Sequence, residues 1–289
     1  MPLSTRPFRI RPGDDVDLKK LPTRIEPVYR SKDDYAAMLE EHVQKLSRLQ
    51  ELLYATNQYS VLILFQALDA AGKDGAIKHV LSGINPQGCD IHNFGKPSTE
   101  ELDHDFLWRT NKVLPERGRI GIFNRSYYEE VLVVRVHPEL LAAQRLPGPR
   151  EPDDDFWQDR FRSITEFEAH QHRNGMRIVK IFLHVSKDEQ RQRLLERIDT
   201  PAKNWKFQAG DIAERKFWKL YRKAYEACLA ATSTKAAPWF VVPADDKLTA
   251  RLIVSQIVLE ALEDLGMSYP EPSSARRAEL AAMRKELEG

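Results

Sequence analysis

The sequence predicts a three-layer α/β fold, in which helices cover both faces of a parallel β-sheet. Apolar segments of strand length alternate with amphipathic segments of helix length, and this order favours right-handed crossovers between parallel strands. In addition, residues 61–75 read as a buried strand, a turn of small residues and the start of a helix. Polar residues also follow several predicted strands, at the sheet edge where parallel sheets bind ligands.

The composition indicates one large domain with short extensions. The chain has 289 residues, which is enough for a full core, and a formal net charge of +1, whereas a general nucleic-acid-binding protein would be strongly basic. It has no apolar run of transmembrane length and no secretory pattern at its start. Cys89 and Cys228 match no metal spacing. We therefore expect a cytoplasmic protein with free thiols and with neither nucleic acid nor a membrane as partner.

The first half of the chain begins with a proline-rich arm at residues 1–30, which we expect to lie on the surface. Apolar residues at helical spacing then predict a helix over 33–54. The elements expected after it are a strand at 61–65, a helix at 73–81, a weaker strand at 88–94, a helix from 98 to about 113 and a strand at 119–123. Ser98 and Glu101 form a capping box that starts the second of these helices.

The second half continues the alternation and contains a proline-rich break at 147–152. The elements expected are a helix crossing back at 131–136, a helix at 153–174, a strand at 177–185, an arginine-rich helix from 186 to about 200, a helix at 211–231, a strand at 239–242 and a helix at 248–265. The residues from 267 onward contain two prolines and many charges, which predicts a peripheral tail.

The turn after the first strand has the layout of a phosphate-binding loop, or P-loop. Gly72 and Lys73 open a helix whose positive end and free backbone N–H groups can bind phosphate, and Lys73 can reach a terminal phosphate. The usual pattern has Gly where this chain has Ala67, and Ser or Thr where it has Asp74. The backbone groups expected to contact phosphate belong to Ala70, Ala71, Gly72, Asp74 and Gly75.

A carboxylate inside this loop, Asp69, is unusual because it repels phosphate unless a metal or a proton intervenes. Asp69 therefore indicates either a metal ligand or a hydrogen bond to an incoming acceptor. The alternative is that residues 71–75 form an ordinary turn in which Asp74 caps the helix. The strand before the turn favours the phosphate site.

A second group of polar residues follows the strand at 119–123. Arg125 can hold phosphate oxygens with two hydrogen bonds, Asn124 occupies a position where a carboxylate is more usual, and Glu129 is the carboxylate nearest in sequence. The alternative explanation for Ser126 and Glu129 is a capping box. It does not explain Asn124 and Arg125.

A third group of basic residues lies in and after the helix that begins near residue 186. Arg193 and Arg197 share one helical face, and Lys203 and Lys206 follow. Arginines that close over a phosphoryl group stabilise its transfer, and this place in the chain is where nucleotide kinases carry their lid. The alternative is a solvated helix whose arginines alternate with acidic residues.

Several short motifs together resemble the family-2 polyphosphate kinases. They lie at 71–75, 123–129, 186–193, 204–207, 232–234 and 237–239, and the resemblance spans about residues 35 to 265 in order. It implies a P-loop kinase-like fold similar to thymidylate kinases, with a helical lid. It also implies transfer of a terminal phosphoryl group between inorganic polyphosphate and AMP, ADP or ATP, with Mg²⁺ or Mn²⁺. Ala67 and Asp74 are then features of the family.

The resemblance assigns roles to the three groups of residues. Asp69 becomes the metal-binding and catalytic carboxylate, and Lys73, Asn124, Arg125 and Glu129 become further catalytic residues. Arg193, Arg197 and Lys206 become phosphate-binding residues of the lid. Members of the family that act mainly on diphosphates carry Asp and Asn where this chain has Asn124 and Glu129, so the chain resembles the subclass that phosphorylates both AMP and ADP.

The family also implies a homo-oligomer, either a dimer or a tetramer. The expected organisation is a surface arm at 1–30, a catalytic domain at 31–266 with a lid at about 186–216, and a tail at 267–289. Two other functions are compatible with the residues: an ATP-dependent nucleoside monophosphate kinase, and a non-catalytic module that binds polyphosphate.

Overall fold

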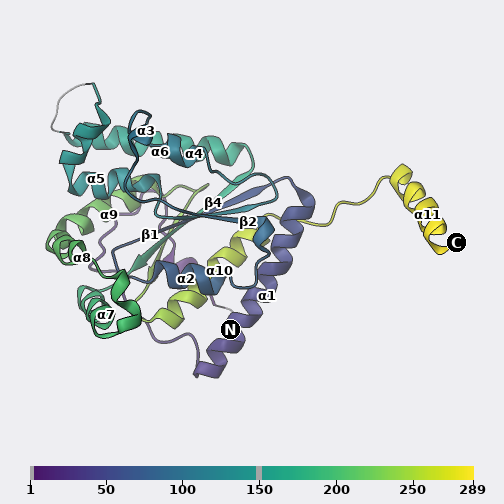
Figure 1. The fold of residues 1–289 in the computed structure, drawn as a ribbon, viewed down its shortest axis with the longest axis horizontal. Coiled ribbons are helices and arrows are strands. Elements are labelled where there is room, and N and C mark those ends of the chain that lie inside the picture. The colour runs from purple at the N-terminus through teal and green to yellow at the C-terminus, as the bar shows by residue number, and fades with distance from the viewer. Residues whose placement is uncertain (1–2, 148–151) are drawn as a thin grey trace.

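A computed structural model describes residues 3–147 and 152–289 and contains a five-stranded sheet at its centre (Figure 1). The strand order is β2-β3-β1-β4-β5, and every pair of neighbours is parallel. The strands are β1 (Ser60–Ala67), β2 (Cys89–Asn93), β3 (Ile120–Asn124), β4 (Met176–His184) and β5 (Trp239–Pro243). Because β1 lies between β3 and β4, the loops that follow these three strands meet at one edge of the sheet.

Helices cover both faces of the sheet, which confirms the predicted three-layer α/β fold (Figure 1). One face carries α1 (Lys32–Thr56), α2 (Lys73–Val80) and α10 (Lys247–Glu263), and the other carries α5 (Val133–Val136), α6 (Asp154–Arg173) and α9 (Trp218–Thr232). The helices α7 (Lys187–Asp199) and α8 (Ala209–Glu214) stand beside the edge where the strands end. All eight residues of β1 are buried, as its continuous apolar pattern predicts.

The helix predicted from 98 to 113 is wrong as a single element. The capping box of Ser98 and Glu101 is present, but α3 (Thr99–Leu102) ends after one turn and α4 (Trp108–Asn111) is separate. Between them, the Asp105 carboxylate accepts a hydrogen bond from the backbone N–H of Leu107 at 2.9 Å. A side chain that bonds its own backbone competes with helix formation, and this explains the break.

The helix predicted over 211–231 is also divided. A 3-10 turn at Arg215–Phe217 separates α8 from α9. At this turn the Arg215 guanidinium donates to the side-chain oxygen of Gln190 and, at 3.2 Å, to the carbonyl of Lys187. These contacts with α7 hold the chain at the point where the two helices change direction.

The two ends of the chain behave differently. In the N-terminal segment, Ile10, Val16 and Leu18 are buried in the core on the α6 and α9 side. Part of this segment therefore belongs to the core and does not lie on the surface as expected. At the other end, α11 (Ser274–Glu288) projects away from the body on an extended segment (Figure 1). Residues 148–151 of the predicted break lie outside the described residues. No helix in the described ranges has the length and apolar character needed to cross a membrane.

Candidate functional site

The loop between β1 and α2 forms a concave turn of backbone at the centre of the sheet edge. Gly72 has a φ of 109°, which favours glycine, and Ala70 adopts φ 60°, which is uncommon for a residue with a side chain. Lys73 begins α2 and folds back so that its Nζ donates to the carbonyl of Ala67 at 3.1 Å. Two positive φ values in three residues direct successive N–H groups toward one place, as anion-binding loops require.

Burial of the Lys73 ammonium lowers its pKa, and the nearby Arg125 charge lowers it further. The carboxylates of Asp69, Glu129 and Asp74 act in the opposite direction. An ammonium that is partly desolvated and close to another cation gains more electrostatic stabilisation when a phosphate binds than a solvated lysine does.

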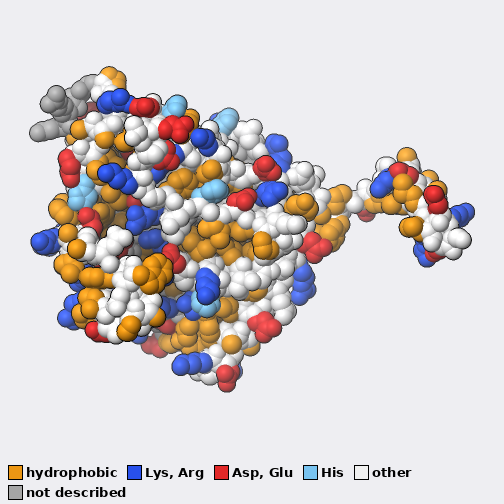
Figure 2. Space-filling model, viewed as in Figure 1, with side chains coloured by type: hydrophobic (Ala, Val, Ile, Leu, Met, Phe, Trp, Pro, Cys, Tyr) orange, Lys and Arg blue, Asp and Glu red, His pale blue; other side chains and the backbone are white. Residues whose placement is uncertain are grey.

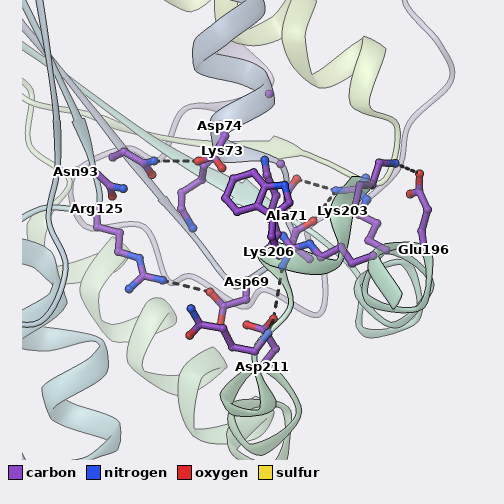
Figure 3. A pocket seen from close by; sticks show the side chains of 18 of the residues that line it. Asp69, Ala71, Lys73, Asp74, Asn93, Arg125, Glu196, Lys203, Lys206 and Asp211 are labelled. Atoms are coloured by element: carbon purple, nitrogen blue, oxygen red, sulfur yellow. Dashed lines mark hydrogen bonds and ion pairs between the residues drawn. The ribbon is translucent and has the colours of Figure 1, made fainter. Parts of the chain in front are cut away.

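Two side chains at the end of β3 lie against this loop, and Figure 3 shows one of them, Arg125, pointing toward Asp69. Arg125 has φ 65° and its Nη2 lies 3.3 Å from the Asp69 carboxylate. The Asn124 amide donates to the Asp74 carboxylate at 3.0 Å, while its buried oxygen has no hydrogen-bond partner among the described residues. A strained backbone and an unpaired buried oxygen are features that gather at functional sites.

Glu129 does not form the capping box that its spacing from Ser126 allows. Ser126 accepts from the backbone N–H of Tyr128 at the start of a 3-10 helix (Tyr127–Val131), and the capping-box explanation of Glu129 is therefore wrong. Instead, with its amide oriented so that both ends face complementary partners, the buried Gln66 donates to Glu129 at 2.9 Å and accepts from Ser126. Burial raises the pKa of Glu129, although the charges of Arg125 and Lys73 oppose that shift.

Arg193 has a different environment from the one expected for a lid arginine. It is 5% exposed, and its Nη1 donates to the carbonyls of Ala70 and Ala71 at 3.2 and 2.7 Å. Its Nη2 donates to the carbonyls of Ala244 and Asp245, and its Nε to Glu189 at 2.8 Å. All five N–H groups of the guanidinium are therefore used. Arg193 ties the loop after β1 to the loop after β5 and fixes the shape of the turn after β1.

The loop, the end of β3 and the segment from α7 to α8 enclose a basic cavity of about 570 Å³. Seven Lys or Arg and four Asp or Glu line it, in a chain whose net charge is only +1. The cations are Lys73, Arg125, Arg193, Arg197, Lys203, Lys206 and Lys247. Figure 2 shows Lys and Arg side chains over and beside the region of α7 and α8. A cavity of this charge focuses positive potential and attracts a polyanion.

Three of these cations pair with carboxylates that also line the basic cavity. Glu196 contacts the ammonium groups of both Lys203 and Lys247, the latter at 3.8 Å (Figure 3). Arg197 lies 3.6 Å from the Asp211 carboxylate. The ammonium of Lys206 is 5.0 Å from the centre of the exposed Trp205 ring. These pairs are partly exposed, so a phosphate chain can exchange with their carboxylates at little cost.

A second cavity of about 420 Å³, the apolar cavity, adjoins the first. Much of its wall is apolar, including Leu102, Phe106, Val134 and Leu140. Arg125 lines both cavities as well as a smaller one of about 170 Å³, which it shares with Asp69 and Glu129. The geometry therefore gives one site for a polyanion and one for a flat apolar group, and the two meet at Arg125.

Two polar residues at the site were not predicted from the sequence. Gln66 orients Glu129, and Gln190 donates to the carbonyl of Asp69 at 2.9 Å. A polar residue within the buried strand was a usable signal for Gln66. Gln190 gave no such signal, because its role depends on how α7 packs against the loop.

The donor set at the loop fits a Mg²⁺-type cation that also binds substrate. The described residues contain no cluster of three or more His, Cys, Asp or Glu that could hold a metal. Mg²⁺ is commonly bound through one or two carboxylates, with phosphate and water completing its shell. Asp69 supplies such a carboxylate beside the turn after β1, and the unpaired oxygen of Asn124 is a second hard acceptor that lines the same cavity.

A buried polar network lies beneath the end of β3. The ammonium of Lys180 on β4 donates to Glu168 on α6 at 2.6 Å, to the Tyr128 hydroxyl at 2.9 Å and to the carbonyl of Thr232 at 2.7 Å. Tyr127 and Tyr128 both donate to the other oxygen of Glu168. Every donor of the ammonium is satisfied, and the network anchors the turn that carries Arg125 and Glu129.

Comparisons with known proteins agree with this geometry. The family profile described as Polyphosphate kinase 2 matches residues 29–269. The ADP-polyphosphate phosphotransferase of Rhodopseudomonas palustris is 58% identical over 99% of both chains. The AMP/ADP-polyphosphate phosphotransferase of Meiothermus ruber is 44% identical over 93% of this chain and 96% of its own. The crystal structure of polyphosphate kinase 2 from Arthrobacter aurescens matches with a TM-score of 0.87 and 37% identity, and covers 98% of this chain and 97% of its own. The chain therefore belongs to the polyphosphate kinase 2 family.

Proposed function

We propose that the protein is a phosphotransferase that moves the terminal phosphoryl group of inorganic polyphosphate to AMP and to ADP, forming ADP and ATP reversibly. The observation that carries this proposal is the meeting of the basic cavity with the apolar cavity at Arg125. A phosphate polymer fits the first and an adenine nucleoside fits the second, so donor and acceptor phosphates would meet beside Lys73. The names of the relatives from Rhodopseudomonas palustris and Meiothermus ruber support both substrate classes.

The proposed mechanism depends on positioning and on charge neutralisation. Polyphosphate would lie along Lys203, Lys206, Lys247 and Arg197, with its terminal phosphate on the backbone N–H groups after Asp69 and on Lys73. Arg125 would hold the acceptor phosphate, and the transferring group would pass between the two. The acceptor phosphate is already ionised near neutral pH, so no strong general base is needed.

We assign Mg²⁺ or Mn²⁺ as the cofactor, held by the Asp69 carboxylate together with substrate phosphates. When bound, such a cation supplies further neutralisation of phosphate charge. The Arg125 guanidinium 3.3 Å from Asp69 keeps that carboxylate in place. We further propose a cytoplasmic homo-oligomer, a dimer or tetramer, that acts on neither nucleic acid nor membrane. Residues 31–266 would form its catalytic domain, with the lid at about 186–216.

The function is tested by incubating the protein with Mg²⁺, long-chain polyphosphate and either AMP or ADP, and by separating the nucleotides by chromatography. We expect ADP and ATP from AMP, and ATP from ADP. Formation of ATP from ADP, with no product from AMP, would keep polyphosphate as the donor and exclude AMP as an acceptor. Transfer from ATP to a monophosphate with no use of polyphosphate would mean an ordinary nucleotide kinase and would contradict the proposal.

Glu129 is proposed to favour AMP over ADP as acceptor. Replacing it with asparagine should lower the ratio of kcat/KM for AMP to that for ADP by about tenfold, the worth of one charge-assisted hydrogen bond. Both values are measured on the same preparation, so the fraction of folded protein cancels in the ratio. Equal losses with the two acceptors would refute this role.

The pH dependence of transfer should also report on Glu129. Burial raises the pKa of Glu129, so on acidification it takes up a proton earlier than an exposed glutamate and its attraction for Arg125 is lost. We expect wild-type kcat/KM for AMP to fall between about pH 7 and pH 4, and the Glu129→Gln variant to lose the part of that fall due to Glu129. The nucleotide's own phosphate titrates equally in both proteins, so identical profiles would show that Glu129 does not contribute.

A further inference from the structure

The C-terminal helix α11 is separated from the rest of the molecule (Figure 1). All of its residues are exposed, and residues 264–273, which include Pro270 and Pro272, connect it to α10. An isolated helix of 15 residues is only marginally stable in water, so a helix in this position needs a partner.

A short apolar seam occupies the C-terminal half of α11. Leu280, Met283 and Leu287 are 43%, 44% and 89% exposed, and Figure 2 shows apolar side chains between charged ones on this helix. Their spacing of three and then four residues matches positions a, d and a of a heptad. A stripe this narrow is typical of the contact between two coiled helices, whereas a helix that packs on a globular core has a wider apolar face.

The charges beside the seam identify the partner and its direction. With Leu280 at position a, both e positions are arginines, Arg277 and Arg284, and both g positions are glutamates, Glu279 and Glu286. In a parallel pair of identical helices, g faces e of the next heptad on the other helix, so Glu279 meets Arg284 of the partner subunit. An antiparallel pair would place g against g and e against e, and every such contact would be repulsive.

We infer that α11 pairs in parallel and in register with α11 of a second copy of this chain. In the single chain, Glu279 bonds Arg276 and Arg284 bonds Glu288. These exposed pairs on the helix surface are weak and can exchange for contacts between the helices. The inference does not depend on the proposed activity, because α11 lies far from the cavities (Figure 1).

Disulfide cross-linking in the full chain tests the pairing. In a background with Cys89→Ser and Cys228→Ala, either Leu280→Cys or Leu287→Cys should give a covalent dimer on mild oxidation, because facing a positions lie within disulfide reach. Lys285→Cys, at the outward f position of the same helix, is the matched control and should remain monomeric. If cross-linking at 280 and 287 fails, or if it is no greater than at 285, the inference is overturned.

Charge reversal tests the direction independently. Glu279→Arg or Arg284→Glu alone should weaken self-association, measured by sedimentation velocity, by about tenfold because two symmetric pairs become repulsions. The variant that carries both substitutions restores opposite charges in a parallel pair and should recover wild-type association. Failure of the double variant to recover, or no effect of either single change, would contradict parallel pairing.

Discussion

Replacing Lys73 with alanine is expected to lower kcat/KM for polyphosphate-dependent transfer by about 10²–10³-fold, the usual cost of removing one preorganised charge stabiliser. The ammonium is held at the loop by the carbonyl of Ala67, and burial lowers its pKa. It is therefore placed to neutralise a phosphate without first moving or losing much water. Transfer is measured as initial ATP formation from ADP with saturating Mg²⁺.

Lys78→Ala is the matched control, because Lys78 lies on the same helix α2 and is exposed. It should leave both the rate and the melting temperature close to those of the wild type. Asp69→Asn should reduce the rate to a similar extent as Lys73→Ala while the fold is kept, since it removes the carboxylate but preserves the shape. Wild-type rates in a folded Lys73→Ala or Asp69→Asn protein would overturn the assignment of this loop.

Replacing Glu168 with alanine is expected to lower the free energy of unfolding by about 3–5 kcal/mol. Glu168 and Lys180 are 1% and 0% exposed, so the substitution leaves a buried ammonium without its counter-charge. It also removes the acceptor for the hydroxyls of Tyr127 and Tyr128. The change in the free energy of unfolding is measured by urea unfolding monitored by circular dichroism.

A double variant separates the cost of the unpaired charge from that of lost packing. Glu168→Leu combined with Lys180→Met removes both charges and should be less destabilised than Glu168→Ala alone, because a buried pair replaced by apolar groups costs less than a broken one. Equal destabilisation of the two variants would show that the ion pair itself matters little. The exposed pair Arg284–Glu288 is a useful reference, since Glu288→Ala should change stability by less than about 1 kcal/mol.

The apolar pattern determined the secondary structure wherever burial dominates. The continuous apolar run at 61–65 predicted a buried parallel strand, and the capping residue Ser98 begins a helix in the structure. The strand, small turn and Gly72-Lys73 were enough to predict a phosphate loop, because that layout depends on local backbone geometry. The apolar pattern predicted single helices over 98–113 and 211–231, and both predictions were wrong. Hydrogen bonds of the Asp105 and Arg215 side chains accompany the breaks in these helices.

The contacts around the candidate site were decided by the tertiary structure. Arg125 meets Asp69 across 56 residues of sequence, and Asn124 meets Asp74 across 50, because β1 and β3 are neighbours in the sheet. The sequence marked Arg193 as a cation of the lid helix, but only the packing of α7 against two loops buries its guanidinium among their carbonyls. Hydrophobic periodicity reports which face of an element is covered, whereas the partner of a polar side chain depends on which elements the fold brings together.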